Sequence, residues 1–324
     1  MKAKMDVIIV CHTEFGFVDG GSVVYEKTAT DGVIEGCRNL IRIAETYGAK
    51  ITFAVMPEVA AYFPGDTNHE VGLHIHPGWQ QLTDTGKMHI FTVGDSVLRE
   101  HCRQSSSSTV LRDYSYEEQL DMIKTGKECL QSQLGVIPKV FVAGRWSLNN
   151  DTVKALIETG FTHECSAVPS SIPSHHDWSQ LPRICPPYYP SEHNYQKEGT
   201  LSLLMVPTSQ IFPRGVVSPE MTPMVGLSWL KACFREYHRQ ELPFFHITLH
   251  SPSMTDSSLS SAMEELIKFI SCHANINFKF ASEIKKYSKI IPKTLIAPYI
   301  GGINRKILLK IFNRLRGFIT FDVV

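Results

Sequence analysis

The chain lacks the long apolar runs that membrane-spanning segments need. No uninterrupted apolar run in its 324 residues approaches the ~18 residues that would cross a bilayer. The first residues, Met1-Lys2-Ala3-Lys4, lead within a few positions into a short apolar segment, without the apolar core of a signal peptide. We therefore expect a cytoplasmic protein.

The chain also lacks a charge excess and paired cysteines. Its 32 Lys+Arg and 32 Asp+Glu residues balance, so nothing indicates a nucleic-acid partner. The eight cysteines are scattered without a C-x-x-C pair, and we interpret them as reduced core residues. A hydrophobic content of 43% and a charged content of 20% are typical of a globular protein with a sizeable core.

Strand-like and helix-like segments alternate along the sequence. We expect strands at 6–10, 51–55, 71–75, 139–143, 161–165, 201–206, 244–249 and 278–281, and helices at 32–47, 115–134, 150–159, 227–239 and 259–273. Asp31 is expected to cap the first helix, and Ser115 with Glu118 forms a capping box. Strands separated by helices imply a parallel sheet. Because a Gly-rich dinucleotide turn is absent, the pattern favours an α/β barrel of seven to eight parallel strands with surrounding helices.

Two segments stand apart from this alternation. The loop from 77 to 112 is long for a compact domain, and loops of this length often bind ligands or cover sites. We assign residues 1–289 to the barrel and 290–324 to a basic amphipathic tail. Residues 304–318 carry five basic side chains and no acid. This segment fits either a helix docked on the barrel or an interfacial helix on an anionic membrane.

The tripeptide His74-Ile75-His76 ends an apolar run and places two imidazoles on the same side of an expected strand. Glu14 closely follows another apolar run. Two histidines and one carboxylate leave an open position on a divalent metal, as in catalytic zinc sites. Zinc suits this donor set best, and cobalt, nickel and iron are the alternatives for the same site. Polar residues that follow expected strands belong to the face where barrels build active sites; these are Glu14, His74, His76, Arg145 and His250.

Four segments resemble the motifs of the polysaccharide deacetylases, the NodB-homology carbohydrate esterases. The resemblance spans residues 6–285 and is closest to the branch of surface-polysaccharide, O-antigen and lipopolysaccharide biosynthesis. The segments are Val10-Cys11-His12-Thr13-Glu14-Phe15-Gly16, Glu70-Val71-Gly72-Leu73-His74-Ile75-His76-Pro77, Phe141-Val142-Ala143-Gly144-Arg145-Trp146 and Thr248-Leu249-His250-Ser251. The resemblance implies a distorted (β/α) barrel that hydrolyses the N-acetyl group of an amino sugar.

The resemblance also implies roles for individual residues. Glu14, His74 and His76 would bind the metal, His250 would be the general acid, and Arg145 would orient the base. Trp79, Trp146 and Tyr188 are candidates for stacking on a sugar, although any one of them could instead be a packing residue.

Two positions depart from the family pattern. Gly78 stands where most members have their second metal histidine, so His76 must take that role. His12 stands where the family has its catalytic Asp. A neutral imidazole can act as a general base, so either His12 takes over this role, another group does, or activity is lost. The alternatives are a non-catalytic sugar-binding relative and a metal-dependent deformylase or amidohydrolase. The expected partner is an amino-sugar glycan or a lipid-linked sugar.

Overall fold

The computed structural model describes residues 4–19, 22–24, 29–77, 108, 110–172, 175–211 and 215–287. The basic tail, most of the long loop after Pro77, and Trp79 lie outside these residues. The predictions made for them, and the division into barrel and tail, therefore stay predictions. None of the described helices is long and apolar enough to cross a membrane.

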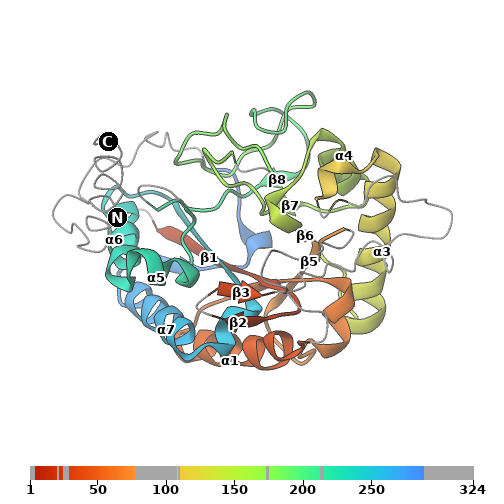
Figure 1. Ribbon diagram of the computed structural model, residues 1–324. Helices are drawn as coiled ribbons and strands as arrows, with labels where there is room; N and C mark the ends of the chain where they lie inside the picture. The colour runs from red at the N-terminus through yellow and green to blue at the C-terminus, as the bar shows by residue number, and fades with distance from the viewer. Residues whose placement is uncertain are drawn as a thin grey trace, which may run out of the picture.

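An eight-stranded sheet in which every pair of strands is parallel forms the centre of the molecule (Figure 1). Its strands are β1 (Met5–Thr13), β4 (Ile51–Val55), β5 (Glu70–Ile75), β6 (Val140–Ala143), β7 (His163–Glu164), β8 (Leu204–Met205), β9 (Phe244–His250) and β10 (Ile276–Phe278). β9 pairs along most of one edge of β1, so β4 and β10 share its other edge. The remaining strands follow β4 in sequence order. The sheet curls into a half-barrel, which confirms the predicted distorted (β/α) barrel.

The barrel is completed between β8 and β9 by single hydrogen bonds rather than by a ladder of paired residues. The backbone N–H of Ser209 donates to His246 O at 3.2 Å, and the N–H of His246 donates to Ser209 Oγ at 2.9 Å. Further along, Thr248 N–H donates to Val217 O at 3.0 Å. Because this connecting segment is irregular, the cross-section departs from that of a regular eight-stranded barrel.

Helices cover most of the outside of the sheet. They are α1 (Asp31–Tyr47), α3 (Tyr116–Leu134), α4 (Asn150–Glu158), α5 (Thr222–Val225), α6 (Leu227–Arg239) and α7 (Ser257–Ser271). In Figure 1, α6 and α7 lie on one side, α1 lies below, α3 and α4 lie on the other side, and a loop-rich segment covers the top. Side chains of β1 alternate between the helix-facing core, with Ile9 and Cys11, and the barrel interior, with Ile8 and Val10. His12 continues the inward-facing series.

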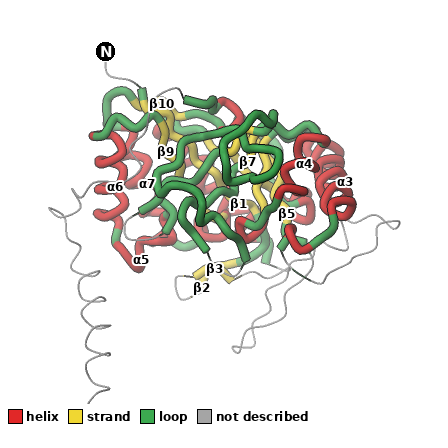
Figure 2. Tube along the Cα trace, turned by 90° about the horizontal axis from the view of Figure 1, so that it is seen from above, coloured by secondary structure: helices red, strands yellow, loops and turns green. Residues whose placement is uncertain are grey.

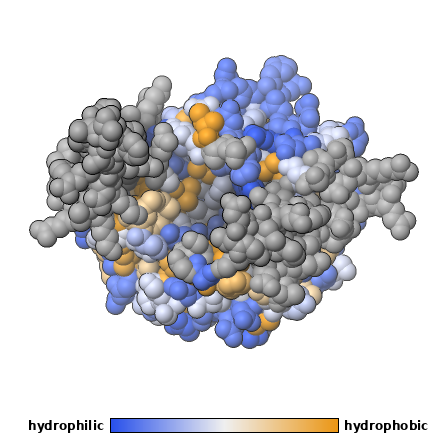
Figure 3. All heavy atoms as spheres, viewed as in Figure 1, coloured by the Kyte–Doolittle hydropathy of each residue, from blue (hydrophilic) through white to orange (hydrophobic). Residues whose placement is uncertain are grey.

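The C-terminal ends of the strands meet at one end of the barrel. A short hairpin of β2 (Phe17–Asp19) and β3 (Ser22–Val24) follows β1 there, and Figure 2 shows it at the end opposite to β10. Figure 3, drawn from the same side as Figure 1, shows the surface hollowed near its centre, with polar and apolar residues around the hollow. The sequence analysis did not predict the hairpin, because each of its strands has only three residues.

Local signals predicted the helices better than the short strands. Gly48 and Gly135 end α1 and α3 in left-handed conformations, and the capping box of Ser115 and Glu118 is present. The predicted capping role of Asp31 is wrong, because Asp31 is the first helical residue and Thr30 occupies the cap position without a side-chain hydrogen bond. β7 and β8 have two residues each, shorter than predicted, because the chain passes there into irregular loops.

Candidate metal centre

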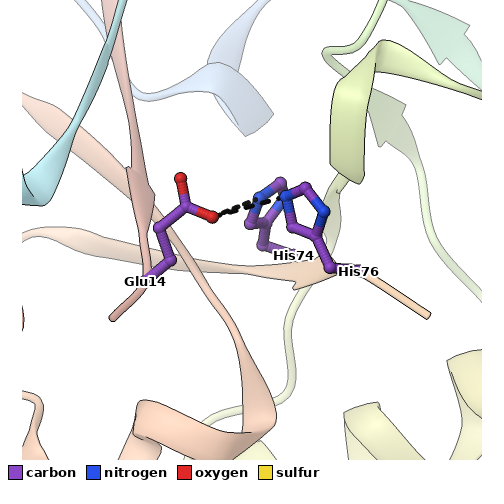
Figure 4. A group of neighbouring side chains, drawn as sticks. All are labelled: Glu14, His74 and His76. Carbon is purple, nitrogen blue, oxygen red and sulfur yellow. Dashed lines mark ion pairs between the residues drawn. The ribbon is translucent and has the colours of Figure 1, made fainter. Parts of the chain in front are cut away.

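Glu14, His74 and His76 converge at the C-terminal ends of β1 and β5, two strands that are separated by β4 in the sheet (Figure 4). Glu14 directly follows β1, His74 lies in β5, and His76 follows the same strand. His74 Nε2 lies 3.7 Å from Glu14 Oε2, and His76 Nε2 lies 3.3 Å from the same oxygen. One candidate ligand atom from each residue lies within 4.8 Å of the others. The spacing of two residues therefore places both imidazoles against one carboxylate.

The atoms of this cluster suit a divalent metal. Within the described part of the chain, neither oxygen of Glu14 nor His74 Nε2 has a hydrogen-bond partner, although both residues are buried. Buried polar atoms without partners are costly, and a cation between them removes that cost. His74 Nδ1 lies 2.9 Å from the Val142 carbonyl oxygen, which can only accept, so Nδ1 carries the hydrogen and Nε2 is left as a ligand atom. The residues therefore fit a metal.

The charges of these residues are also those of metal ligands. Burial alone raises the pKa of Glu14, but the adjacent imidazoles of His74 and His76 outweigh it and hold that pKa well below its ordinary value. Burial lowers the pKa of His76 to about 4, although Glu14 opposes this shift. At neutral pH the carboxyl group is ionised and His76 is neutral, which are the protonation states that metal binding requires.

His250 lies beside the cluster and is paired with Glu220. His250 Nδ1 donates to Glu220 Oε2 at 2.9 Å, and its backbone N–H donates to Oε1 at 2.7 Å. Ser253 Oγ donates to Glu220 Oε1 at 2.6 Å. His250 Nε2 lies 3.5 Å from Glu14 Oε1. Burial alone lowers the pKa of His250, but the Glu220 carboxylate outweighs it and raises that pKa to about 9, so the imidazole is protonated at neutral pH.

Glu220 is the residue of this site that the sequence analysis missed. It lies in a short 3-10 helix, Pro219–Met221, far from any predicted strand end. Its local sequence, Ser218-Pro219-Glu220, reads only as the start of a helix, and Ser218 indeed accepts a hydrogen bond from Glu220 N–H. The pairing with His250 spans 30 residues, so no local pattern could have indicated it.

His12 is enclosed by rings inside the barrel. Its ring centroid lies 4.9 Å from those of His74 and His250 and 4.7 Å from that of Trp146. Its Nε2 lies 3.3 Å from Thr248 Oγ1. Burial, followed by the neighbouring imidazoles of His74 and His250, lowers the pKa of His12 well below its ordinary value. The structure thus brings His12 into the cluster as a neutral imidazole.

Arg145 and Trp146 form a tight turn after β6 and lie at the edge of the cluster. Arg145 Nη1 donates to His175 Nε2 at 2.7 Å, while the Trp146 ring packs on His12. The expected orienting role of Arg145 toward position 12 stays a prediction. Tyr188 is 5% exposed, and its hydroxyl donates to Tyr195 O at 2.8 Å. This burial argues for a packing role of Tyr188 rather than for stacking on a sugar.

The fold is that of solved carbohydrate deacetylases. The chain superposes on a protein named as a polysaccharide deacetylase from Pseudomonas aeruginosa PAO1 with a TM-score of 0.55 and 13% identity, covering 87% of this chain and 90% of that one. A protein named likewise from Mycobacterium smegmatis gives a TM-score of 0.53 and 15% identity over 90% and 96% of the two chains. Puue allantoinase superposes with a TM-score of 0.54 and 14% identity, covering 87% of this chain and 89% of the allantoinase chain.

No family model matches the sequence, and no curated protein matches it. At identities of 13–15% the structural likeness establishes the fold alone. Since the similar structures include both deacetylases and an allantoinase, the reaction must be argued from the side chains of the site.

Proposed function

We propose that the protein is a metal-dependent hydrolase that removes N-acetyl groups from an amino sugar, in a glycan or a lipid-linked precursor of a surface polysaccharide. The observation that carries this proposal is the buried Glu14–His74–His76 cluster with His250, paired to Glu220, beside it. Amide hydrolysis needs an activated water and an acid for the leaving amine. The cluster is suited to hold the metal that activates water, and His250 is placed to be the acid.

The residues of the chain would divide the chemistry between them. When bound to Glu14, His74 and His76, a divalent metal, for which zinc is the best fit, supplies Lewis-acid polarisation of the acetyl carbonyl and activation of water. His250 Nε2 faces Glu14 and would give its proton to the leaving amine, while Glu220 holds the ring through Nδ1. If Nε2–H of His12 donates to Thr248 Oγ1, its Nδ1 is left to accept a proton.

One observation favours a second candidate, a sugar-binding relative without turnover. The pKa of His12 is lowered well below its ordinary value by burial and by the neighbouring imidazoles. A weaker base transfers a proton less effectively. The deacetylase proposal therefore depends on whether His12, in place of a carboxylate, still accepts a proton from water.

The cellular setting is part of the proposal. The seven cysteines among the described residues are free, which supports a reducing, cytoplasmic compartment. The basic segment 304–318 would hold the enzyme at the inner face of the membrane through anionic lipids. A lipid-linked sugar would then be presented at the same surface.

The deciding experiment measures acetate and formate release by zinc-loaded protein from N-acetylated and N-formylated amino sugars, both free and lipid-linked. We expect acetate release, retained or increased in His12→Asp if position 12 is the base. His74→Ala should lose the zinc, as measured by elemental analysis, together with the activity. Sugar binding without any release in the zinc-loaded wild type would favour the second candidate, and formate release alone would identify a deformylase. Stoichiometric zinc in His74→Ala would contradict the site itself.

A further inference from the structure

The turn after β6 contains two consecutive residues in the left-handed region, Arg145 with φ of 53° and Trp146 with φ of 58°. Residues with side chains rarely adopt this conformation, and two in succession are rarer still. Such a turn persists only where the surrounding structure holds it. Neither residue is a glycine, so the local sequence does not favour the turn.

The carbonyl groups of these two residues are each held by a side chain from one segment of the chain. His176 Nδ1 donates to Arg145 O at 2.9 Å, and Trp178 Nε1 donates to Trp146 O at 3.0 Å. His176 is 6% exposed and Trp178 is fully buried. Two buried donors therefore fix both peptide groups of the strained turn.

His176 and Trp178 are themselves held in place. His176 Nε2 lies 3.2 Å from Ser171 Oγ, and Trp178 N–H donates to Ser171 O at 2.8 Å. The Trp178 ring meets the ring of Tyr195 edge to face with centroids 5.0 Å apart. Both donors are thus anchored to Ser171, and Trp178 also packs on Tyr195, so these contacts set the positions from which the turn is held.

Both ends of the turn touch the metal cluster. On one side, the Trp146 ring lies edge-on to His12 at 4.7 Å. On the other side, Gly144 is so close to His76 that a Cβ added at position 144 would lie 2.5 Å from the imidazole. A change in the turn would therefore displace a neighbour of His12 and a neighbour of a predicted metal ligand together.

We propose that His176 and Trp178 are positioning residues of the site. Through the carbonyl groups of Arg145 and Trp146 they hold the Trp146 ring against His12 and the β6 end against His76. The effect on rate rests on the proposed function, whereas the placement of Trp146 does not. The alternative is that Trp178 only fills the core; its indole N–H would then have no influence on His12.

The test removes the indole N–H while keeping an aromatic ring, in Trp178→Phe. The matched control is Trp229→Phe, which makes the same change at a buried position of α6. The first readout is the NMR signal of the His12 ring in histidine-labelled protein, assigned by its loss in His12→Gln. We expect this signal to move in Trp178→Phe, because the ring current of Trp146 changes with its position, and to stay unchanged in Trp229→Phe. A His12 signal in Trp178→Phe that is unchanged from the wild type, as in Trp229→Phe, would overturn the proposal.

The second readout separates placement from binding. In Trp178→Phe we expect kcat to fall about tenfold, the effect of ~1.4 kcal/mol on a barrier, with KM changed less than about twofold. If the wild type proves inactive on every sugar, the proposed function fails, and the NMR readout alone still decides whether Trp178 places the Trp146 ring against His12. The two failures can therefore be told apart.

A second pair of variants covers the case in which Trp178→Phe does not fold. His176→Asn keeps an amide donor near the position of Nδ1, whereas His176→Leu removes it. We expect the His12 signal to be retained in His176→Asn and shifted in His176→Leu. Equal signals in the two variants would contradict the role of His176.

Discussion

Position 144 shows how one side chain would disturb the whole cluster. Gly144 follows β6, and a Cβ there would lie 2.5 Å from Cγ and Nδ1 of His76, a distance that real atoms do not keep. The His76 ring would have to move, and His76 is a predicted ligand. The absence of a side chain at 144 therefore belongs to the geometry of the metal site.

We predict that Gly144→Ala weakens zinc binding by about tenfold or more, since neighbours that orient a ligand typically change metal affinity by 10–100-fold. The measurement is zinc titration against a competing chelator. Gly65→Ala is the matched control, because no atom lies within 4 Å of a Cβ built at Gly65. Equal zinc affinities in the two variants would mean that His76 is not a ligand.

Glu220 sets the charge of His250. The carboxylate outweighs the effect of burial and raises the pKa of His250 to about 9. In Glu220→Gln the negative charge is lost, so this pKa should fall. Because a general acid must be protonated to act, we predict that the alkaline limb of kcat/KM moves to lower pH and that the rate at neutral pH drops by about tenfold or more.

The pH profile of kcat/KM and an NMR titration of His250 check this prediction. The control is Glu192→Gln, which changes an exposed carboxylate. It should leave the pH profile of kcat/KM and the titration of His250 unchanged. An alkaline limb that stays in place in Glu220→Gln would remove His250 from the role of acid.

At the scale of elements, the ends of helices differ in how they are held. Ser115 caps α3 through a hydrogen bond from Glu118 N–H, in a complete capping box. Thr30 occupies the same position before α1 but makes no side-chain hydrogen bond to the helix. The two residues are chemically alike, so together they isolate the contribution of the cap.

We predict that Ser115→Ala lowers the free energy of unfolding by ~1 kcal/mol, whereas Thr30→Ala changes it by less than ~0.5 kcal/mol. Urea unfolding followed by circular dichroism gives both values. A loss in Thr30→Ala equal to that in Ser115→Ala would show that the hydrogen bond of the capping box is not what stabilises α3.

At the scale of the whole molecule, Glu164 in β7 links stability to pH. It is fully buried, and burial raises its pKa to about 8 despite hydrogen bonds from Ser166 that lower it. The unfolded chain releases this proton near its ordinary pKa of 4.5. Between these two values the native state holds a proton that the unfolded state has lost. The stabilisation is therefore complete below the lower pKa and disappears as pH rises through the upper one.

We predict that the free energy of unfolding of the wild type falls by at most ~1.4 kcal/mol per pH unit from this group between about 4.5 and 8. Glu164→Gln, which cannot ionise, should show a flatter dependence and greater stability at pH 8 than the wild type. Denaturant unfolding at several pH values measures this difference, with Glu192→Gln as an exposed control. Parallel curves for Glu164→Gln and the wild type would show that Glu164 ionises normally.

The fold was predictable because its signals are local. Apolar runs marked β1, β4 and β5, and helical spacing marked α6 at the bounds observed. β7 and β8 were less predictable, since strands of two residues carry almost no periodicity. Their pairing depends on neighbouring strands and not on their own sequences.

The sequence by itself determined the alternation of strands and helices, and it placed His74 and His76 on one side of a strand, because side-chain direction in a strand depends only on spacing. The tertiary structure alone decided which distant residues act on that pair. Glu220 meets His250, Trp146 meets His12, and His176 with Trp178 holds the turn between them. These contacts join segments whose proximity follows from the closure of the barrel, and closure is a property of the packed molecule that no local pattern contains.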